Sequence, residues 1–435
     1  MDFLDILLKK REGKKLTKQE IDFFISGVTN ETIPDYQISA FLMAIYFQSL
    51  DEQETAQLTM AMANSGEMFD LSDISGFKVD KHSTGGVADT TTLILAPLVA
   101  STGVNVVKMS GRGLGFSGGT LDKLESIPNF SIHVQQQQAI QWAKTSHIVI
   151  MGQNKNLTPA DQKLYALRDV TATVESLPLI ASSIMSKKIA AGADGIVLDV
   201  KCGNGAFMKT LEDAQKLGSI MASMGRHVGK KITVVISSMA QPLGNYIGNR
   251  LEVIEAIETL KGNVKGDLLT VSITLGAHML VLAGKVSSEE EGKALLLQQI
   301  QNGKGLAKFK ELLHQQGGNI KVIDDYSLLP LSEYRLSLTA STSGYIQSMD
   351  TASIGRASQQ TGAGRKEKTD KIDFGAGIIL KKRIGDKVEK GDVLAQIYSC
   401  SQERAQKALS IVQNAIVIGD TCPSQPKLLL DIITA

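Results

Sequence analysis

Apolar residues recur at helical spacing in the first part of the chain. Five of them predict one buried face of a helix: Ile38, Phe41, Leu42, Ile45 and Tyr46. Thr17 with Glu20, and Asp51 with Glu54, fit the capping box that begins a helix. The beginning of the chain is therefore predicted to form a small layer of helices.

From about Lys78 onward, short β-branched runs alternate with longer helical segments. The predicted strands include Val104–Val107, Ile148–Ile150, Ile196–Val200 and Ile232–Ile236. Strands separated by helices need crossover connections, so they predict a largely parallel sheet. The apolar stretch at residues 268–284 lacks Asp, Glu, Lys and Arg but carries polar Ser, Thr and His side chains. It predicts a buried helix and not a membrane span.

The pattern changes again near residues 331–345, beyond which short strands alternate with glycine turns. The predicted fold class is α/β, with three parts. They are an all-helical domain of residues 1–68, joined in space by 160–192; a larger α/β domain of residues 69–159 and 193–335 with a mostly parallel sheet; and a small C-terminal β-rich (α+β) domain of residues 336–435.

The C-terminal part contains IGDKVEKGDVLAQI, which is similar to half of a biotinyl or lipoyl carrier domain. A carrier presents a lysine at a hairpin tip in a matching motif, and this segment lacks that motif. The favoured interpretation is a small structural β domain.

Composition narrows the class of protein. Lys and Arg total 46 against 45 for Asp and Glu, so no general attraction to nucleic acid or to anionic membranes is expected. Cys202, Cys400 and Cys422 have no metal-like spacing, which disfavours disulfides and zinc and favours a reducing cytoplasm. The beginning of the chain does not fit a signal peptide.

The segment KHSTGGVADTTT, which begins at Lys81, is the first with candidate chemistry. Gly85 and Gly86 allow backbone N–H groups to approach an anion, while Lys81 adds charge and Ser83 and Thr92 add donors. A second segment, VVKMSGRGLGFSGGTLDKLES, runs from a strand through a glycine-dense loop into a helix. Two such loops at the ends of parallel strands predict a phosphate site.

A third segment, YALRDVTATVESLPLIASSIMSKK, places Arg168, Ser183 and Lys187 on predicted helices. Ser183 and Lys187 are four residues apart, so they share a helix face. Solvated charges are the usual interpretation of isolated basic residues. Here the neighbouring residues are apolar, so a lysine that points into that layer needs a partner.

Together these segments resemble the thymidine and pyrimidine-nucleoside phosphorylase family. SGRGLGFSGGTLDKLE carries the closest likeness, and KHSTGG, LRDVTATV, SSIMSKK and GAFM add to it. The resemblance covers nearly the whole chain. It implies an enzyme that uses inorganic phosphate to cleave pyrimidine nucleosides to free base and (deoxy)ribose 1-phosphate. It also implies an active site in the cleft between the helical and α/β domains, and a homodimer formed through the helical domain.

The resemblance assigns roles residue by residue. Phosphate binding is expected at Lys81, His82, Ser83, Thr92, Lys108, Met109, Ser110 and Thr120. The base is expected at Arg168, Ser183, Lys187, Leu114 and Phe207. The catalytic groups are expected to be His82, Arg168, Ser183 and Lys187, with His82 near the base carbonyl O2. The charged groups suit a leaving pyrimidine on which negative charge builds up.

The resemblance also implies one structural monovalent cation, K⁺, and no organic cofactor. Its expected ligands are Ala88, Thr90, Leu243, Tyr246 and Glu255. Hard oxygen ligands of this kind suit such an ion. Lys108 indicates the broader members of the family, which accept uridine, thymidine and deoxyuridine, because members restricted to thymidine and deoxyuridine tend to have an apolar residue there.

Several residues depart from the family pattern. Ala88 replaces a usual Gly, which costs ~1 kcal/mol if the position needs a positive φ. Phe116 and Ser117 replace a usual His-Thr pair, and Cys202 and Asn204 stand where smaller residues are common. These departures bear on cation affinity and sugar preference more than on the class of reaction.

Other functions remain open at this level. One is a thymidine-restricted phosphorylase, and another is a non-catalytic relative that binds nucleosides. A third is an anthranilate-type phosphoribosyltransferase, which needs Mg²⁺ and generally an adjacent Asp-Glu pair. The chain has such a pair only at Asp51 and Glu52, far from the phosphate loops.

Overall fold

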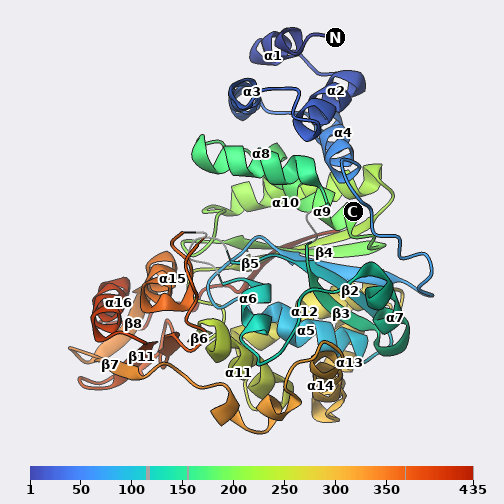
Figure 1. Cartoon of the computed structure of the whole chain (residues 1–435). Coiled ribbons are helices and arrows are strands. Elements are labelled where there is room, and N and C mark those ends of the chain that lie inside the picture. Colours follow the sequence, from blue (N-terminus) through green and yellow to red (C-terminus); the bar gives the residue numbers. More distant parts are fainter. Residues whose placement is uncertain (114–117, 154–155, 368, 435) are drawn as a thin grey trace.

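The computed structural model describes residues 1–113, 118–153, 156–367 and 369–434. It confirms the predicted fold class, with a helical part at one end, an α/β part in the middle and a β-rich part at the side (Figure 1). Within the described ranges, no helix has both the length and the apolar character needed to cross a membrane.

The helical part is built from two groups of helices that are distant in sequence. They are α1 (Phe3–Arg11), α2 (Lys18–Thr29), α3 (Asp35–Gln48), α4 (Glu52–Ala63), α8 (Pro159–Val170) and α9 (Leu177–Ala190). Both predicted capping boxes are present at the starts of α2 and α4. Leu164 of α8 and Leu179 of α9 join the apolar core formed by α1 to α4. On α3, the predicted buried face is correct except at Tyr46, which is 40% exposed.

The central sheet contains five parallel strands. They are β1 (Lys78–Ser83), β2 (Asn105–Ser110), β3 (Ile148–Gly152), β4 (Gly195–Cys202) and β5 (Lys231–Ser238). Their order in the sheet is β5-β4-β1-β2-β3, so β1 lies in the middle. Loops that follow β1 and β2 therefore emerge side by side at one edge of the sheet.

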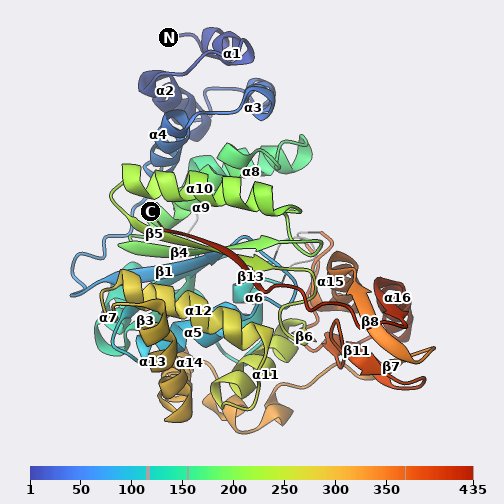
Figure 2. The ribbon, with the colours of Figure 1, turned by 180° about the vertical axis from the view of Figure 1, so that it is seen from behind.

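The last strand, β13 (Leu429–Thr434), pairs antiparallel with β5 at the edge of this sheet. Figure 2 shows it returning from the C-terminal part along β5. The prediction that residues 336–435 form one separate domain therefore does not hold for residues 429–434. Because β5 and β13 are far apart in the sequence, no local sequence pattern predicts that they pair.

Helices cover both faces of the sheet (Figures 1 and 2). α9 and α10 (Leu211–His227) lie between the sheet and the N-terminal helices, while α5 (Thr91–Ala100) and α12 (Asp267–Leu282) lie on the other face. α12 confirms the predicted buried helix. The remaining helices of this part are α6 (Thr120–Glu125), α7 (Gln136–Ser146), α11 (Asn249–Leu260), α13 (Glu289–Gln301) and α14 (Lys304–Gln315), with 3-10 turns η1 (Ile320–Ile323) and η2 (Tyr326–Leu328).

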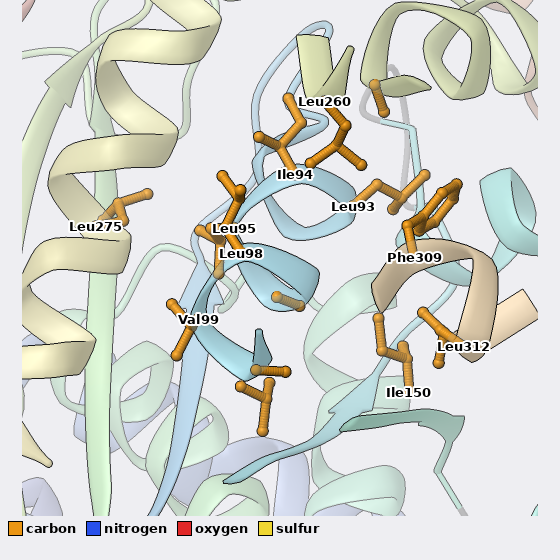
Figure 3. Packing of buried hydrophobic residues seen from close by; sticks show 14 of the residues in the cluster. Leu93, Ile94, Leu95, Leu98, Val99, Ile150, Leu260, Leu275, Phe309 and Leu312 are labelled. Atoms are coloured by element: carbon orange, nitrogen blue, oxygen red, sulfur yellow. The ribbon is translucent and has the colours of Figure 1, made fainter. Parts of the chain in front are cut away.

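The core beneath the sheet fixes α5 in place. Every residue of α5 is buried, and its leucines pack against Phe309 and Leu312 of α14 and Leu275 of α12 (Figure 3). Burying a side chain of this size stabilises a fold by ~1.5–3 kcal/mol. The loop at residues 84–90, which runs directly into α5, is therefore held at its far end.

The C-terminal part contains two small antiparallel sheets. One has the order β6-β9-β11-β7 and the other β10-β8-β12. Its elements are β6 (Tyr246–Ile247), β7 (Tyr334–Thr339), β8 (Gly344–Met349), α15 (Thr351–Ser358), η3 (Gln359–Ala363), β9 (Gly377–Leu380), β10 (Lys387–Val388), β11 (Val393–Ser399), α16 (Gln402–Ala415) and β12 (Ile416–Gly419). Because β6 follows β5 in the α/β part, the two parts share a sheet.

Candidate active site

The loop after β1 has a shape that depends on its glycines. Gly85 has a φ of +95°, which favours glycine. A Cβ at Gly86 would lie only 2.7 Å from Met239 Sδ. Ser83 Oγ accepts from Gly85 N–H at 3.2 Å and donates to Asp89 Oδ2 at 2.5 Å. The loop therefore has a defined conformation and carries hydroxyl groups at the end of the central strand.

Lys81 is buried under this loop beside two carboxylates. Its Nζ donates to Thr91 Oγ1 at 2.6 Å and lies 3.5 Å from Asp199 Oδ2. Burial lowers the pKa of Lys81, although Asp89 and Asp199 oppose that change. Burial also acts to raise the pKa of Asp89, but Lys201 and Lys81 hold it well below its ordinary value. Asp89 is therefore ionised at neutral pH.

β2 brings a second lysine to the same end of the sheet. Lys108 Nζ lies 3.3 Å from Asp80 Oδ1 and also donates to the backbone carbonyl of Lys81. Lys188 of α9 donates to Asp80 Oδ2 and to the carbonyl of Met109, both at 2.8 Å. Burial lowers the pKa of Lys108 to about 7 against the attraction of Asp80. Sequence reasoning missed Asp80 and Lys188, which join β1, β2 and α9.

Arg168 projects from α8, and backbone carbonyls hold its guanidinium. Nε, Nη1 and Nη2 donate to the carbonyls of Thr173, Leu179 and Val174 at 3.2, 3.1 and 2.6 Å. The side chain is only 2% exposed, and burial lowers its pKa. An arginine stays charged in proteins, so this group provides a fixed positive charge.

Lys187 has the partner that its apolar surroundings require. Its Nζ lies 2.5 Å from Asp161 Oδ2 on α8 and donates to Ser183 Oγ at 3.0 Å. The ring of Tyr165 is 5.8 Å from the same nitrogen. Asp161 lies just before the segment that carries Arg168, and Tyr165 is the first residue of that segment, but no motif marked either of them in advance.

One cavity of about 340 Å³ brings these groups together. Its lining includes all but one of the predicted phosphate, base and catalytic residues: Lys81, His82, Ser83, Thr92, Lys108, Met109, Ser110, Thr120, Arg168, Ser183, Lys187 and Phe207. The other, Leu114, lies outside the described residues, as do Phe116 and Ser117. The cavity thus has basic and hydroxyl groups from the α/β part on one side and from α8 and α9 on the other.

His82 lines this cavity as a neutral imidazole. Burial lowers its pKa well below the ordinary value of 6.5, and the charges of Lys188 and Lys108 lower it further. A neutral imidazole donates one hydrogen bond and accepts another. His82 therefore provides a hydrogen-bond donor and not an additional positive charge.

The predicted cation ligands include a buried carboxylate. Glu255 is 2% exposed and accepts from the N–H groups of Asn245 and Tyr246 at 2.7 and 3.2 Å. Burial raises its pKa to about 7, and no ion pair with Glu255 occurs within the described part of the chain. The charge of Arg383 lowers the pKa of Glu255 only in part, and a bound monovalent cation would add a positive charge in direct contact with the carboxylate.

The other predicted cation ligands lie in or next to the loop that follows β1. Gly244 N–H donates to the carbonyl of Ala88 at 3.2 Å, which connects the 242–246 segment to the loop after β1. Thr90 Oγ1 donates to Glu252 at 2.6 Å, so its lone pairs stay available. Ala88 has a φ of +55°, so alanine occupies the conformation that favours glycine. The oxygen ligands fit a hard monovalent cation.

Comparisons with known proteins cover the whole length of the chain. Three family models match it: "Glycosyl transferase family, helical bundle domain" over residues 4–66, "Glycosyl transferase family, a/b domain" over residues 75–306, and "Pyrimidine nucleoside phosphorylase C-terminal domain" over residues 345–419. Pyrimidine-nucleoside phosphorylases of Staphylococcus epidermidis (strain ATCC 12228) and Staphylococcus aureus (strain USA300) are 53% and 54% identical over 434 residues, covering 100% of both chains.

Among solved structures, anthranilate phosphoribosyltransferase from Thermus thermophilus has a TM-score of 0.60 at 18% identity, covering 73% of this chain and 99% of that one. This likeness concerns the fold alone, whereas the identity to the staphylococcal enzymes extends over the full length of the chain. With its cavity residues matching the motifs quoted above, the chain belongs to the pyrimidine-nucleoside phosphorylase family.

Proposed function

We propose that the chain catalyses the reversible phosphorolysis of pyrimidine nucleosides to free base and (deoxy)ribose 1-phosphate. The observation that carries this proposal is one cavity lined by described residues of both glycine-rich segments together with Arg168, Ser183 and Lys187. A size of about 340 Å³ suits a small-molecule ligand. The names of the staphylococcal relatives support the same reaction.

Phosphate binds on the α/β side of the cavity. The groups available there are Lys81, Ser83, Thr92, Lys108, Ser110 and Thr120. The base binds on the opposite side, where Arg168 and Lys187 donate to its carbonyl oxygens and Ser183 can donate or accept. Phe207 lines the apolar side of the pocket.

The charges of the cavity match the charges that develop in the reaction. As the bond from the sugar C1′ to the pyrimidine N1 breaks, its electron pair leaves with the base, and a phosphate oxygen forms the new bond to C1′. Arg168 and Lys187 stabilise the negative charge on the base, since fixed charges act strongly where water is excluded. Neutral His82 donates a hydrogen bond to the base carbonyl O2.

The substrate range includes uridine, thymidine and deoxyuridine. The support is Lys108, a basic side chain that lines the cavity where thymidine-restricted members tend to have an apolar residue. The alternative, a thymidine-restricted enzyme, would use the same groups for phosphate and base. A nucleoside-binding relative without activity would retain the cavity but release no base.

One K⁺ per subunit is proposed at Ala88, Thr90, Leu243, Tyr246 and Glu255, where it braces the phosphate loop. The chemistry that supports it is the unpaired carboxylate of Glu255 among the described residues. A cytoplasmic location is proposed from the free cysteines. No nucleic acid or membrane partner is proposed, because the net charge is +1.

The chain is proposed to form a homodimer through the helical part. Tyr36 and Phe47 on α3 are 74% and 75% exposed and lie about three turns apart, so they share a helix face. Leu4 on the neighbouring α1 is 48% exposed. Aromatic side chains of this kind are enriched in interfaces between subunits. A second copy of this chain is the proposed occupant.

The decisive experiment is base release from uridine and from thymidine, with and without inorganic phosphate. Phosphate-dependent release from both nucleosides, lost in Lys187→Ala, is the expected result. Release from thymidine alone would contradict the role of Lys108. No release from either nucleoside would favour the non-catalytic relative.

A further inference from the structure

The segment 203–208, between β4 and α10, forms a closed loop at the mouth of the cavity. Gly203 N–H donates to the carbonyl of Met208 at 2.9 Å, and Ala206 N–H donates to the carbonyl of Gly203 at 3.1 Å. Lys209 Nζ donates to the carbonyls of Asn204 and Ala206 at 3.1 and 2.7 Å. Because these bonds close the loop on itself, a displacement of one residue displaces the others.

This loop carries two residues of the cavity wall, Phe207 and Met208. Phe207 is 45% exposed, so packing around its own ring holds it only in part. Its position therefore depends on how the loop backbone is attached to the rest of the protein. One attachment lies within the α/β part, where Gly205 N–H donates to the carbonyl of Met239 at 3.1 Å.

The other attachment is the side chain of Asn204, which reaches the C-terminal part. Asn204 Nδ2 donates to the carbonyl of Met349 at 2.9 Å, and Oδ1 accepts from Thr351 N–H at 2.8 Å. The same Nδ2 makes a longer hydrogen bond of 3.4 Å to the carbonyl of Ala240 in the α/β part. These two residues flank the junction of β8 and α15. The amide thus satisfies one carbonyl at the end of a strand and one N–H in the first turn of a helix, both in the C-terminal part.

Close backbone packing reinforces this contact. A Cβ at Gly205 would lie 2.3 Å from Thr351 Cγ2, so only glycine lets the loop approach α15 this closely. Both donor and acceptor groups of one side chain are used across the two parts, and the next residue has no room to move toward α15. The loop is therefore seated against the C-terminal part at a defined distance.

We propose that Asn204 is a positioning residue, which uses the C-terminal part to hold the loop of Phe207 and Met208 against the base side of the cavity. The proposal rests on the proposed function only in naming the ligand as a pyrimidine nucleoside. It assigns the C-terminal part a role in substrate affinity. Phosphate affinity should not depend on this contact, because the side chains proposed to bind phosphate lie on β1, β2, α5 and α6.

The test compares Asn204→Ala with Asp350→Ala. Asp350 Oδ1 accepts from Ser353 N–H at 3.0 Å and so caps the same helix from within the C-terminal part. Both variants remove a cap of α15, but only the first one detaches the loop. We expect Asn204→Ala to raise the KM for uridine roughly five- to tenfold, as for the loss of one or two neutral hydrogen bonds, with the KM for phosphate unchanged. Asp350→Ala should leave both constants within roughly twofold.

Hydrogen exchange in the full chain provides a second readout. Amides of residues 203–208 should exchange faster in Asn204→Ala and at the unmodified rate in Asp350→Ala. Asn204→Asp, which keeps the acceptor for Thr351 N–H, should fall between Asn204→Ala and the unmodified protein in both measurements. Equal effects of the Asn204 and Asp350 variants on KM, or unchanged exchange of residues 203–208, would overturn the positioning role. Absence of phosphorolysis in the unmodified protein would contradict the proposed function instead, and the exchange comparison would still decide the role of Asn204.

Discussion

Asp161 of α8 lies 2.5 Å from Lys187 of α9, and this ion pair holds the lysine at the wall of the cavity. The Asp161 side chain is 2% exposed, whereas the Lys187 side chain is 23% exposed. The buried partner is therefore the one that fixes the geometry, and the ammonium group remains accessible. An ion pair of this kind orients a charge as well as neutralising part of it.

Asp161→Asn should weaken catalysis by misplacing Lys187. The amide keeps the shape of the side chain but removes the negative charge that holds the ammonium. We expect kcat/KM for uridine to fall about 10- to 100-fold, because a hydrogen bond to a charged group contributes ~1.5–3 kcal/mol. Steady-state kinetics with varied nucleoside at saturating phosphate would measure this change.

The matched control is Asp169→Asn on the same helix, where the side chain is exposed. Surface substitutions of this kind usually change stability by less than ~0.5 kcal/mol. Asp169→Asn should therefore retain nearly full activity. Unchanged kinetics in Asp161→Asn would show that Ser183 and Tyr165 suffice to position Lys187.

Lys108 should make phosphate use depend on pH near neutrality. Burial lowers its pKa to about 7, so the side chain is positively charged below that pH and neutral above it. We expect kcat/KM for phosphate, which reports groups of the free enzyme, to fall as the pH rises through about 7. Profiles of the unmodified protein and Lys108→Met would be compared.

Phosphate itself titrates in the same range, so the difference between these two profiles is the informative quantity. Lys108→Met removes only the contribution of the lysine. Two profiles of identical shape would contradict a titrating Lys108. The same variant tests substrate range, since the ratio of activity on uridine to activity on thymidine should fall when Lys108 is lost.

Features of the fold that depend on residues close together along the chain could be predicted from local sequence patterns. The capping boxes at Thr17 and Asp51 form as predicted, because a cap is made within four residues. The parallel strands were also predicted, since crossover connections follow from alternating strands and helices. The pairing of β13 with β5 was not, because antiparallel pairing over such a distance depends on where the intervening chain ends.

The candidate site, like the fold, could be predicted from the sequence only in part. Lys81, Arg168 and Lys187 stand in motifs that can be identified along the sequence, and the cavity contains all of them. No sequence motif identifies Asp80 or Asp161, because each of them interacts with partners on other elements. The need for a partner to Lys187 followed from its apolar neighbours, but the identity of that partner required the arrangement of α8 against α9.

Removal of K⁺ should destabilise the protein, and Glu255→Gln should abolish that dependence. A ligand that binds only the folded state raises the free energy of unfolding by ~2.7 kcal/mol when its free concentration is 100 times its Kd. We expect a higher Tm in potassium chloride than in tetramethylammonium chloride at equal ionic strength. The neutral amide of Glu255→Gln needs no compensating cation, so its Tm should be the same in both salts.

Glu258→Gln on the same helix is the control for the cation experiment. Glu258 interacts with Tyr326, Lys261 and Asn263 and is not among the proposed cation ligands. Its variant should keep the full response to potassium. An equal potassium response in Glu255→Gln would place the cation elsewhere or show that the salt acts without binding.

Phe47→Lys should dissociate the proposed dimer. A lysine at this position puts a positive charge into the centre of an apolar contact, and by the symmetry of a two-fold interface the charge occurs on both subunits. Burying such charges without partners costs several kcal/mol each, more than a typical interface residue contributes. Sedimentation equilibrium should therefore give twice the chain mass for the unmodified protein and the chain mass for the variant. Leu297→Lys, at a residue of α13 that is 41% exposed and remote from α3, should remain dimeric. If the unmodified protein had the mass of a single chain, the proposed dimer would be wrong. If Phe47→Lys remained a dimer, the interface would lie away from α3.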